Sequence, residues 1–239
     1  MKTQHKFLVY LFVMMGIFLM ISTGCKKKTD PDPVPATVAD IDGNVYHMVT
    51  IGTQVWLAEN LKTTKYRNGD AIPEVTVDSL WNKQSVTSTG AYCNYNNDGA
   101  NPAVYGHLYN WYAVNDSRGL APAGWHVATK TEWETLTTYL GGDSLAGGKL
   151  KETGTAHWQT PNTGATNLTG FTALPGGFRM YSGKSEMIGT FGIWWTSTFA
   201  DDFSAMNCGM FNDNAGAIVS VNRKANGSSI RCIRNQGTP

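Results

Sequence analysis

The chain has 239 residues, enough for one large or two small domains, and a formal net charge of only +1 at pH 7. Charged residues make up 15% of it, whereas glycine (26), tyrosine (10) and tryptophan (8) are abundant. A charge near zero supplies no basic surface for nucleic acid. Few charges combined with many aromatic residues and glycines favour a loop-rich extracytoplasmic domain over a helical bundle.

The N-terminus predicts export. Residues 7–21 form an almost unbroken apolar run behind a basic start, and this run is shorter than the roughly 20 residues of a membrane-spanning helix. Three small residues then precede Cys25, as in a bacterial lipobox, although Ser22 stands where leucine is usual. We predict a lipoprotein signal peptide over residues 1–24. Fatty acyl chains such as palmitate on Cys25 then hold the protein on the cell membrane or outer membrane, facing the periplasm or the exterior. A plain signal peptide or an uncleaved anchor are the alternatives.

Residues 25–39 are predicted to be a flexible tether, because three lysines are followed by alternating Asp and Pro and little that can be buried. The pattern changes at Asp40, and we expect one folded domain over residues 40–235 with a short tail at 236–239. Residues 45–51 alternate as a strand does, Gly52-Thr53 suits a two-residue turn, and a partner strand follows.

The middle of the chain holds fewer regular patterns. Residues 71–90 are expected to be irregular, 91–95 to be a short strand, and 105–114 to be a helix. The clearest element is the stretch from Gly124 to Gly142. It reads as a strand leading into a helix in which Thr129 and Glu132 form a capping box and Gly141-Gly142 ends the helix.

After Gly142 the chain is expected to be rich in loops. A turn over 167–175 is predicted to lead into a strand near Phe178. Further strands are predicted to complete a sheet over residues 193–197, 205–210, 217–221 and 229–233.

Seven motifs in order resemble the Fibrobacter succinogenes major paralogous domain, a family common in secreted and lipid-anchored proteins of Bacteroidetes-like bacteria. They lie at residues 42–46, 54–61, 105–112, 124–136, 170–177, 194–198 and 229–232. The resemblance covers residues 40–234 and implies a domain and a compartment without an established activity. More distantly, the chain resembles the formylglycine-generating enzyme and C-type-lectin-like folds. That likeness implies a loop-rich α+β domain with two helices packed beside a twisted antiparallel sheet.

The cysteines allow several states in an exported protein. Cys208 and Cys232, on the elements that flank the C-terminal part, form the candidate disulfide. Members of the family often carry a cysteine where this chain has Ala121, which implies that Cys93 has lost its partner. The alternative is that all three cysteines are reduced.

No catalytic set is recognisable. The chain has no H-E-x-x-H zinc motif, no G-x-S-x-G elbow, and no second cysteine near Cys232 to match the copper-binding pair of the formylglycine enzymes. His47, His107, His126 and His157 have no carboxylate at ligand spacing, and His126 lacks a visible orienting partner. We therefore expect a protein that is not an enzyme and has no catalytic or metal-ligating residues.

Two clusters are candidate binding residues. One contains Asn94, Asn96, Asn97 and Asp98 beside Tyr95, and the other contains Asp201, Asp202 and residues 212–214. Their oxygens could hold calcium, although the spacing matches no calcium loop and Asx turns explain such runs better. Aromatic residues near loops could stack on sugars, and those considered are Tyr95, Tyr105, Tyr181 and Phe203.

The preferred hypothesis is a lipid-anchored, non-catalytic binding module for glycans or surface proteins, with the membrane as its other partner. An enzyme related to the formylglycine group and a structural subunit of a surface assembly are the alternatives.

Overall fold

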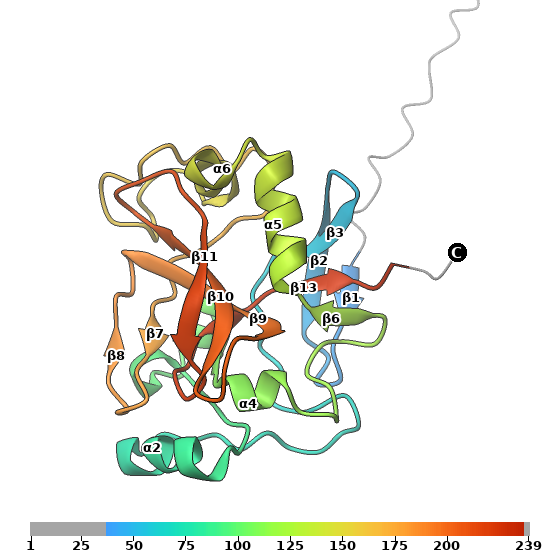
Figure 1. Ribbon diagram of the computed structural model, residues 1–239, viewed down its shortest axis with the longest axis vertical. Helices are drawn as coiled ribbons and strands as arrows, with labels where there is room; N and C mark the ends of the chain where they lie inside the picture. The colour runs from blue at the N-terminus through green and yellow to red at the C-terminus, as the bar shows by residue number, and fades with distance from the viewer. Residues whose placement is uncertain (1–36, 237–239) are drawn as a thin grey trace, which may run out of the picture. The chain divides into compact units, whose positions relative to one another are not determined.

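The computed structural model describes residues 37–236, which fold as an α+β domain with two main sheets (Figure 1). The predictions for residues 1–36, including the signal peptide and acylation of Cys25, lie outside the described residues, as do residues 237–239. None of the helices within 37–236 combines the length and apolar character that crossing a membrane requires. The expected mixture of helices and antiparallel strands is confirmed.

The first sheet brings the two ends of the domain together. Its strands are β1 (Thr37–Ala39), β2 (Val45–Ile51), β3 (Gln54–Leu57), β13 (Cys232–Arg234) and β6 (Trp125–Val127), in the order β1-β2-β3-β13-β6. Ile233 pairs with Trp56 on one side and His126 on the other, so the last strand lies between β3 and β6. β1 occupies the last residues of the segment predicted to be a tether, so the ordered domain begins by Thr37.

The second sheet has the order β11-β10-β9-β12. Its strands are β9 (Phe191–Phe199), β10 (Ser204–Phe211), β11 (Ile218–Arg223) and β12 (Ser229–Ile230). β12 runs parallel to β9, whereas the other pairs are antiparallel. The strand predicted over residues 229–233 is therefore divided between two sheets, and the chain crosses from one to the other at Arg231.

Five helices lie within residues 37–236: α2 (Asp78–Thr87), α3 (Asn101–Tyr105), α4 (Trp111–Val114), α5 (Lys130–Tyr139) and α6 (Asp143–Leu150). Smaller elements are the 3-10 turn η1 (Tyr95–Asn97), the pair β4 (Tyr92–Cys93) with β5 (Leu108–Tyr109), and the pair β7 (Phe178–Arg179) with β8 (Ser185–Glu186). α5 begins with the predicted capping box: Thr129 accepts a hydrogen bond from the Glu132 N–H, and the Glu132 carboxylate accepts one from the Thr129 N–H.

Three predictions for the helices are wrong. Residues 71–90 contain α2, which gave no periodic signal because Trp81 is its only buried residue. Residues 105–114 are not one helix, because α3 ends at Tyr105, β5 follows, and Asn110 caps the short α4. α6 begins directly after Gly142, although a loop was expected there.

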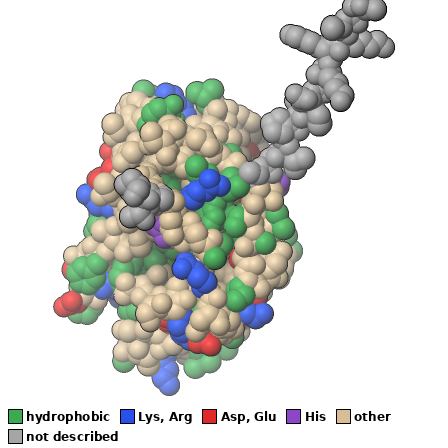
Figure 2. Space-filling view, turned by 90° about the vertical axis from the view of Figure 1, so that its right-hand side faces the viewer, with side chains coloured by type: hydrophobic (Ala, Val, Ile, Leu, Met, Phe, Trp, Pro, Cys, Tyr) green, Lys and Arg blue, Asp and Glu red, His purple; other side chains and the backbone are tan. Residues whose placement is uncertain are grey.

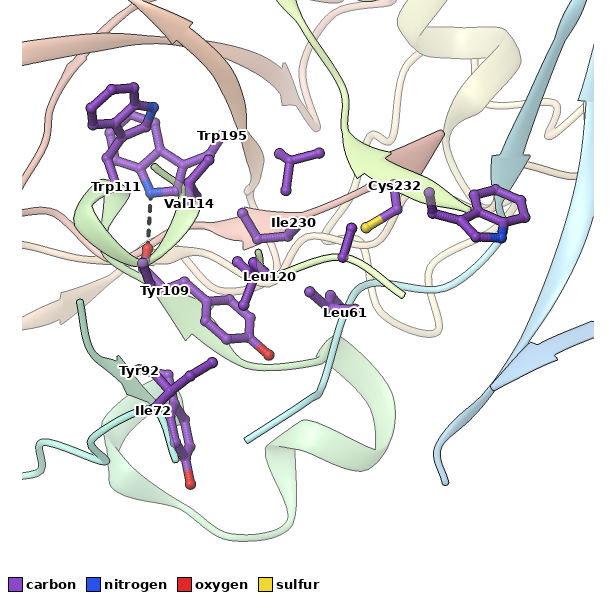
Figure 3. Packing of buried hydrophobic residues seen from close by; sticks show 14 of the residues in the cluster. Leu61, Ile72, Tyr92, Tyr109, Trp111, Val114, Leu120, Trp195, Ile230 and Cys232 are labelled. Carbon is purple, nitrogen blue, oxygen red and sulfur yellow. Dashed lines mark hydrogen bonds between the residues drawn. The ribbon is translucent and has the colours of Figure 1, made fainter. Parts of the chain in front are cut away.

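Tryptophans dominate the core. Trp133 of α5 packs against Trp56 and Trp194, and its ring centroid lies 5.0 Å from that of Trp56 and 6.1 Å from that of Trp194. A second cluster lies on the other face of β9 around Trp111 and Trp195 (Figure 3), where the Trp195 indole N–H donates to the Tyr109 carbonyl at 2.8 Å. β9 thus carries neighbouring tryptophans into two separate cores.

Candidate binding surface

Arg231 is the junction between the two sheets. Its side chain is buried and donates to the carbonyl oxygens of Leu57 (2.8 Å), Phe171 (2.7 Å) and Thr172 (3.0 Å). A fourth hydrogen bond runs to the side-chain oxygen of Asn60 at 2.7 Å. Burial lowers the pKa of Arg231 to about 9, so the guanidinium remains charged at neutral pH.

The sequence motifs of residues 54–61, 170–177, 194–198 and 229–232 converge on this junction. Asn60 also accepts from the Trp194 indole at 2.8 Å, so one amide oxygen joins three of the motifs. Arg179 forms a second buried anchor, donating to the Val75 and Thr76 carbonyls and to Asp78 at the start of α2. Asn60, Trp194 and Arg231 of the motifs, together with Arg179, therefore hold the core together and are not available to a ligand.

The expectation that His126 lacks an orienting partner is wrong. Its Nε2 lies 2.9 and 3.0 Å from the two carboxylate oxygens of Glu132, and its Nδ1 lies 2.7 Å from the side-chain oxygen of Asn235. His47 and His157 also contact carboxylates, those of Glu59 and Glu152. Spacing concealed these pairs because each carboxylate lies 12, 6 or 5 residues from its histidine, which is not the i,i+3 or i,i+4 spacing that brings side chains together on a helix.

The His126 cluster has acceptors on both ring nitrogens, which favours the imidazolium. The hydrogen bond to Glu132 raises the pKa of His126, and burial only partly opposes it. Burial raises the pKa of Glu132, but hydrogen bonds from His126 and Thr129 outweigh it, and the net shift is downward. The cluster joins β6, the start of α5 and the end of the C-terminal strand through a charge pair. We assign it a structural role.

The stability contributed by this cluster depends on pH. A raised folded-state pKa for His126 stabilises the protein below the ordinary histidine value near 6.5, and this contribution disappears as pH rises through the folded-state pKa. The lowered pKa of Glu132 makes its own contribution fade at acidic pH. We expect His126→Gln to destabilise the protein more at pH 5.5 than at pH 8.5 in urea unfolding at about those pH values. An equal loss at both would exclude the charged pair.

The predicted disulfide between Cys208 and Cys232 is not formed. Cys93, Cys208 and Cys232 are all unpaired and buried within the described residues. Cys208 faces the core under α5, whereas Cys232 faces the core around Trp195, so the two thiols point into different clusters. Burial raises the pKa of Cys93 to about 11 and that of Cys232 to about 12, which keeps both as neutral thiols at neutral pH.

The first predicted binding cluster is largely used by the fold. Tyr95 is buried, with only 8% of its surface exposed, so it offers no platform for a ligand. Asn96 and Asn97 have left-handed φ values of 52° and 57°, and the Asn97 amide donates to the Thr76 carbonyl. Asp98 accepts from the Ala100 N–H in an Asx turn.

The structure separates the second predicted cluster: Asp201 and Asp202 lie at the tip of the β9–β10 hairpin, whereas residues 212–214 follow the other end of β10. Asp201 accepts from the N–H groups of Phe203 and Ser204, which closes the turn. Asp202 is exposed, and its carbonyl accepts from Lys224. No group of three or more His, Cys, Asp or Glu side chains suited to a metal occurs within residues 37–236. Of the aromatic residues considered for stacking, Phe203 is 78% exposed, whereas Tyr105 and Tyr181 are half-buried.

A shallow groove of about 210 Å³ lies on the second sheet, on the face opposite α5. It is lined by Phe178, Phe191, Ile193, Asn207, Ser220, Val221 and Asn222. The register places Asn207 opposite Ser220 and Ala205 opposite Asn222, so the polar residues form a row across β10 and β11 beside the phenylalanines of β7 and β9.

The aromatic side of the groove is fixed by packing. Phe191 stacks on Phe211 with ring centroids 4.1 Å apart and meets Phe178 edge-on at 6.3 Å. A Cβ atom at Gly209 would lie 2.8 Å from the Phe191 ring, so glycine makes room for it on the sheet. Phe178 and Phe191 remain partly exposed. The result is a rigid aromatic edge beside a row of amide and hydroxyl groups.

The polar side of the groove is also ordered. Asn207 is 1% exposed, donates to the Ser220 carbonyl at 3.2 Å and accepts from the Ser220 hydroxyl at 3.1 Å. The Asn222 side-chain oxygen accepts from Asn226 at 2.7 Å. No local pattern singles out these residues, because the lining comes from four strands whose register is set by tertiary contacts.

The surface over the first sheet has a different character. Figure 2 shows this face, on which lysines and arginines are spaced between hydrophobic and neutral side chains without forming a single large basic patch.

Residues 49–234 match the Fibrobacter succinogenes major domain family, and the chain belongs to this family. Searches of curated proteins and of solved structures found no match.

Proposed function

We propose that the protein is a lipid-anchored, non-catalytic binding module whose groove on the second sheet holds a glycan. The observation that carries this proposal is the partly exposed phenylalanine pair, Phe178 and Phe191, beside the accessible side chains of Ser220 and Asn222. Binding sites for small molecules combine an apolar wall with a few oriented polar groups, and this groove has both.

A sugar ring fits this chemistry because it has two kinds of surface. The C–H groups of a pyranose face are apolar and lose little when they leave water to pack on an aromatic ring. The hydroxyls at its edge each donate and accept hydrogen bonds, which suits amide and hydroxyl partners. The volume of about 210 Å³ suits one ring of a longer chain, with neighbouring units lying over the exposed strand β11.

The proposal includes the location expected from the sequence. Acylation of Cys25 would place the domain at the cell membrane or outer membrane, beyond a Lys/Asp/Pro tether, where glycans and surface proteins are within reach. We also propose that the domain has a fold like those of C-type lectins and the formylglycine-generating enzyme. The mixed architecture and the ordered motifs support this assignment.

One experiment tests both parts. Full-length wild-type protein and Cys25→Ser are expressed with labelled palmitate in a bacterium with a lipoprotein pathway, purified, and applied to a glycan array. We expect wild-type protein to incorporate palmitate, Cys25→Ser to incorporate none, and the same glycans to be bound by both. Equal palmitate labelling of the two proteins, or none in either, would contradict the anchor, and an array without any bound glycan would contradict the ligand class.

A further inference from the structure

A second pocket, unrelated to the groove, lies between α4 and the β9–β10 hairpin. Its volume is about 410 Å³. It is lined by Ser88, Trp111, Tyr112, Asn115, Asp116, Ser117, Asp202 and Lys224. These residues come from four separate segments of the chain. Asp202 was a candidate binding residue, and Trp111 and Tyr112 belong to the motif at residues 105–112.

Lys224 is the unusual group in this pocket. It is only 5% exposed, and its ammonium lies over the rings of Trp111 and Phe199, at 4.9 and 4.2 Å from their centroids. Within residues 37–236, the one hydrogen bond of this ammonium runs to the Asp202 carbonyl at 3.2 Å. None of the salt bridges within residues 37–236 involves it.

The ammonium of Lys224 has one hydrogen-bond acceptor among the described residues. An ammonium has three donors, and two of those on Lys224 have no acceptor within the described residues. The aromatic faces recover part of the lost hydration energy, but they do not replace hydrogen bonds. A ligand that offers acceptor atoms would complete the coordination of this group.

The rest of the lining restricts the ligand further. Asp202 is exposed and carries no hydrogen bond on its carboxylate within the described residues, and Asn115 and Ser117 add further polar groups. Asp116 also contributes a carboxylate, which Arg118 binds at 2.8 Å. A carboxylate ligand would be repelled by Asp202, and a simple amine would offer nothing to Lys224. A neutral hydroxyl can accept from Lys224 and donate to Asp202.

We propose that this pocket is a second, independent site that binds one ring of a neutral polyhydroxylated ligand, with Lys224 donating to it and Asp202 accepting from it. This pocket and the groove share only the class of ligand. Two sites on one anchored domain would raise the apparent affinity for a long or repeated glycan without new contacts.

The test is saturation-transfer NMR on the full-length protein, with glucose, galactose, mannose and N-acetylglucosamine as neutral probes, and glucuronate and glycine as charged probes. We expect at least one neutral sugar to give a signal. Asp202→Ala removes an exposed side chain and is expected to weaken the binding of that sugar roughly tenfold, equivalent to about 1.4 kcal/mol. Lys224→Met keeps an apolar stem over the rings and is expected to weaken it at least as much.

Circular dichroism identifies any variant that fails to fold, and Asp202→Ala keeps the test decisive if Lys224→Met is lost. Phe191→Ala in the groove is the matched comparison and should leave the Asp202-dependent signal unchanged. A signal that depends on Phe191 and not on Asp202 would locate all sugar binding in the groove and overturn the second site. Binding of glucuronate or glycine alone, or of no probe, would overturn it as well.

Discussion

Replacing Arg231 with methionine is expected to lower the free energy of unfolding by at least about 3 kcal/mol. The substitution keeps much of the side-chain volume but removes the donors for the Leu57, Phe171 and Thr172 carbonyls. Buried carbonyls left without donors each cost about 1–3 kcal/mol. The guanidinium also packs over the Phe171 ring, with its carbon 4.3 Å from the centroid. Urea unfolding followed by tryptophan fluorescence measures the loss.

Arg234→Met is the matched control, three residues along the same segment. Arg234 is exposed and contacts the Met48 sulfur and the Trp125 ring at the surface, so its loss should cost less than about 1 kcal/mol. Equal effects of the two substitutions would show that Arg231 is not the junction of the two sheets.

Gly147→Ala is expected to destabilise the protein by at least about 2 kcal/mol, although alanine is the better helix former by about 1 kcal/mol. A Cβ atom at this position of α6 would overlap the carbonyl group of Gly216. The loop cannot easily move away, because the N–H of Gly148 donates to the Ala215 carbonyl and Lys151 donates to the Asn214 carbonyl. Thermal and urea unfolding both report the change.

Gly99→Ala provides the control for the glycine prediction. Gly99 has no atom within 4 Å of an added Cβ, and its φ is not in the left-handed region. Alanine there should change stability by less than about 1 kcal/mol. A Gly147→Ala protein as stable as the wild type would mean that α6 and the loop of residues 212–217 separate without cost.

Local signals predicted local structure well. The capping box of α5 needs only Thr129 and Glu132, three residues apart, and both the cap and the strand before it are confirmed. The β2–β3 hairpin is confirmed for the same reason, since its alternation and its turn lie within a dozen residues. α2 was missed because a helix attached through Trp81 alone shows no apolar stripe.

Long-range contacts could not be predicted from the sequence, because the spacing of residues along the chain does not show which distant residues meet. His126 and Asn235 are 109 residues apart, and Arg231 is 171 residues from Asn60. The division of residues 229–233 between two sheets depends on where β9 and β3 lie, which no periodicity records. The same holds for the groove and for the Lys224 pocket, whose linings come from several segments each. The candidate residues chosen from Asn/Asp runs proved to be mainly turn formers.

The most direct test of the central claim is calorimetric titration of the glycan selected on the array into full-length wild-type protein, Phe191→Ala and Phe203→Ala. Phe203 is the matched control, because it is 78% exposed and does not line the groove. The account predicts that Phe191→Ala weakens binding roughly tenfold or more while Phe203→Ala leaves it within about twofold. Wild-type affinity in a folded Phe191→Ala protein, or a larger loss in Phe203→Ala, would contradict a glycan site in the groove.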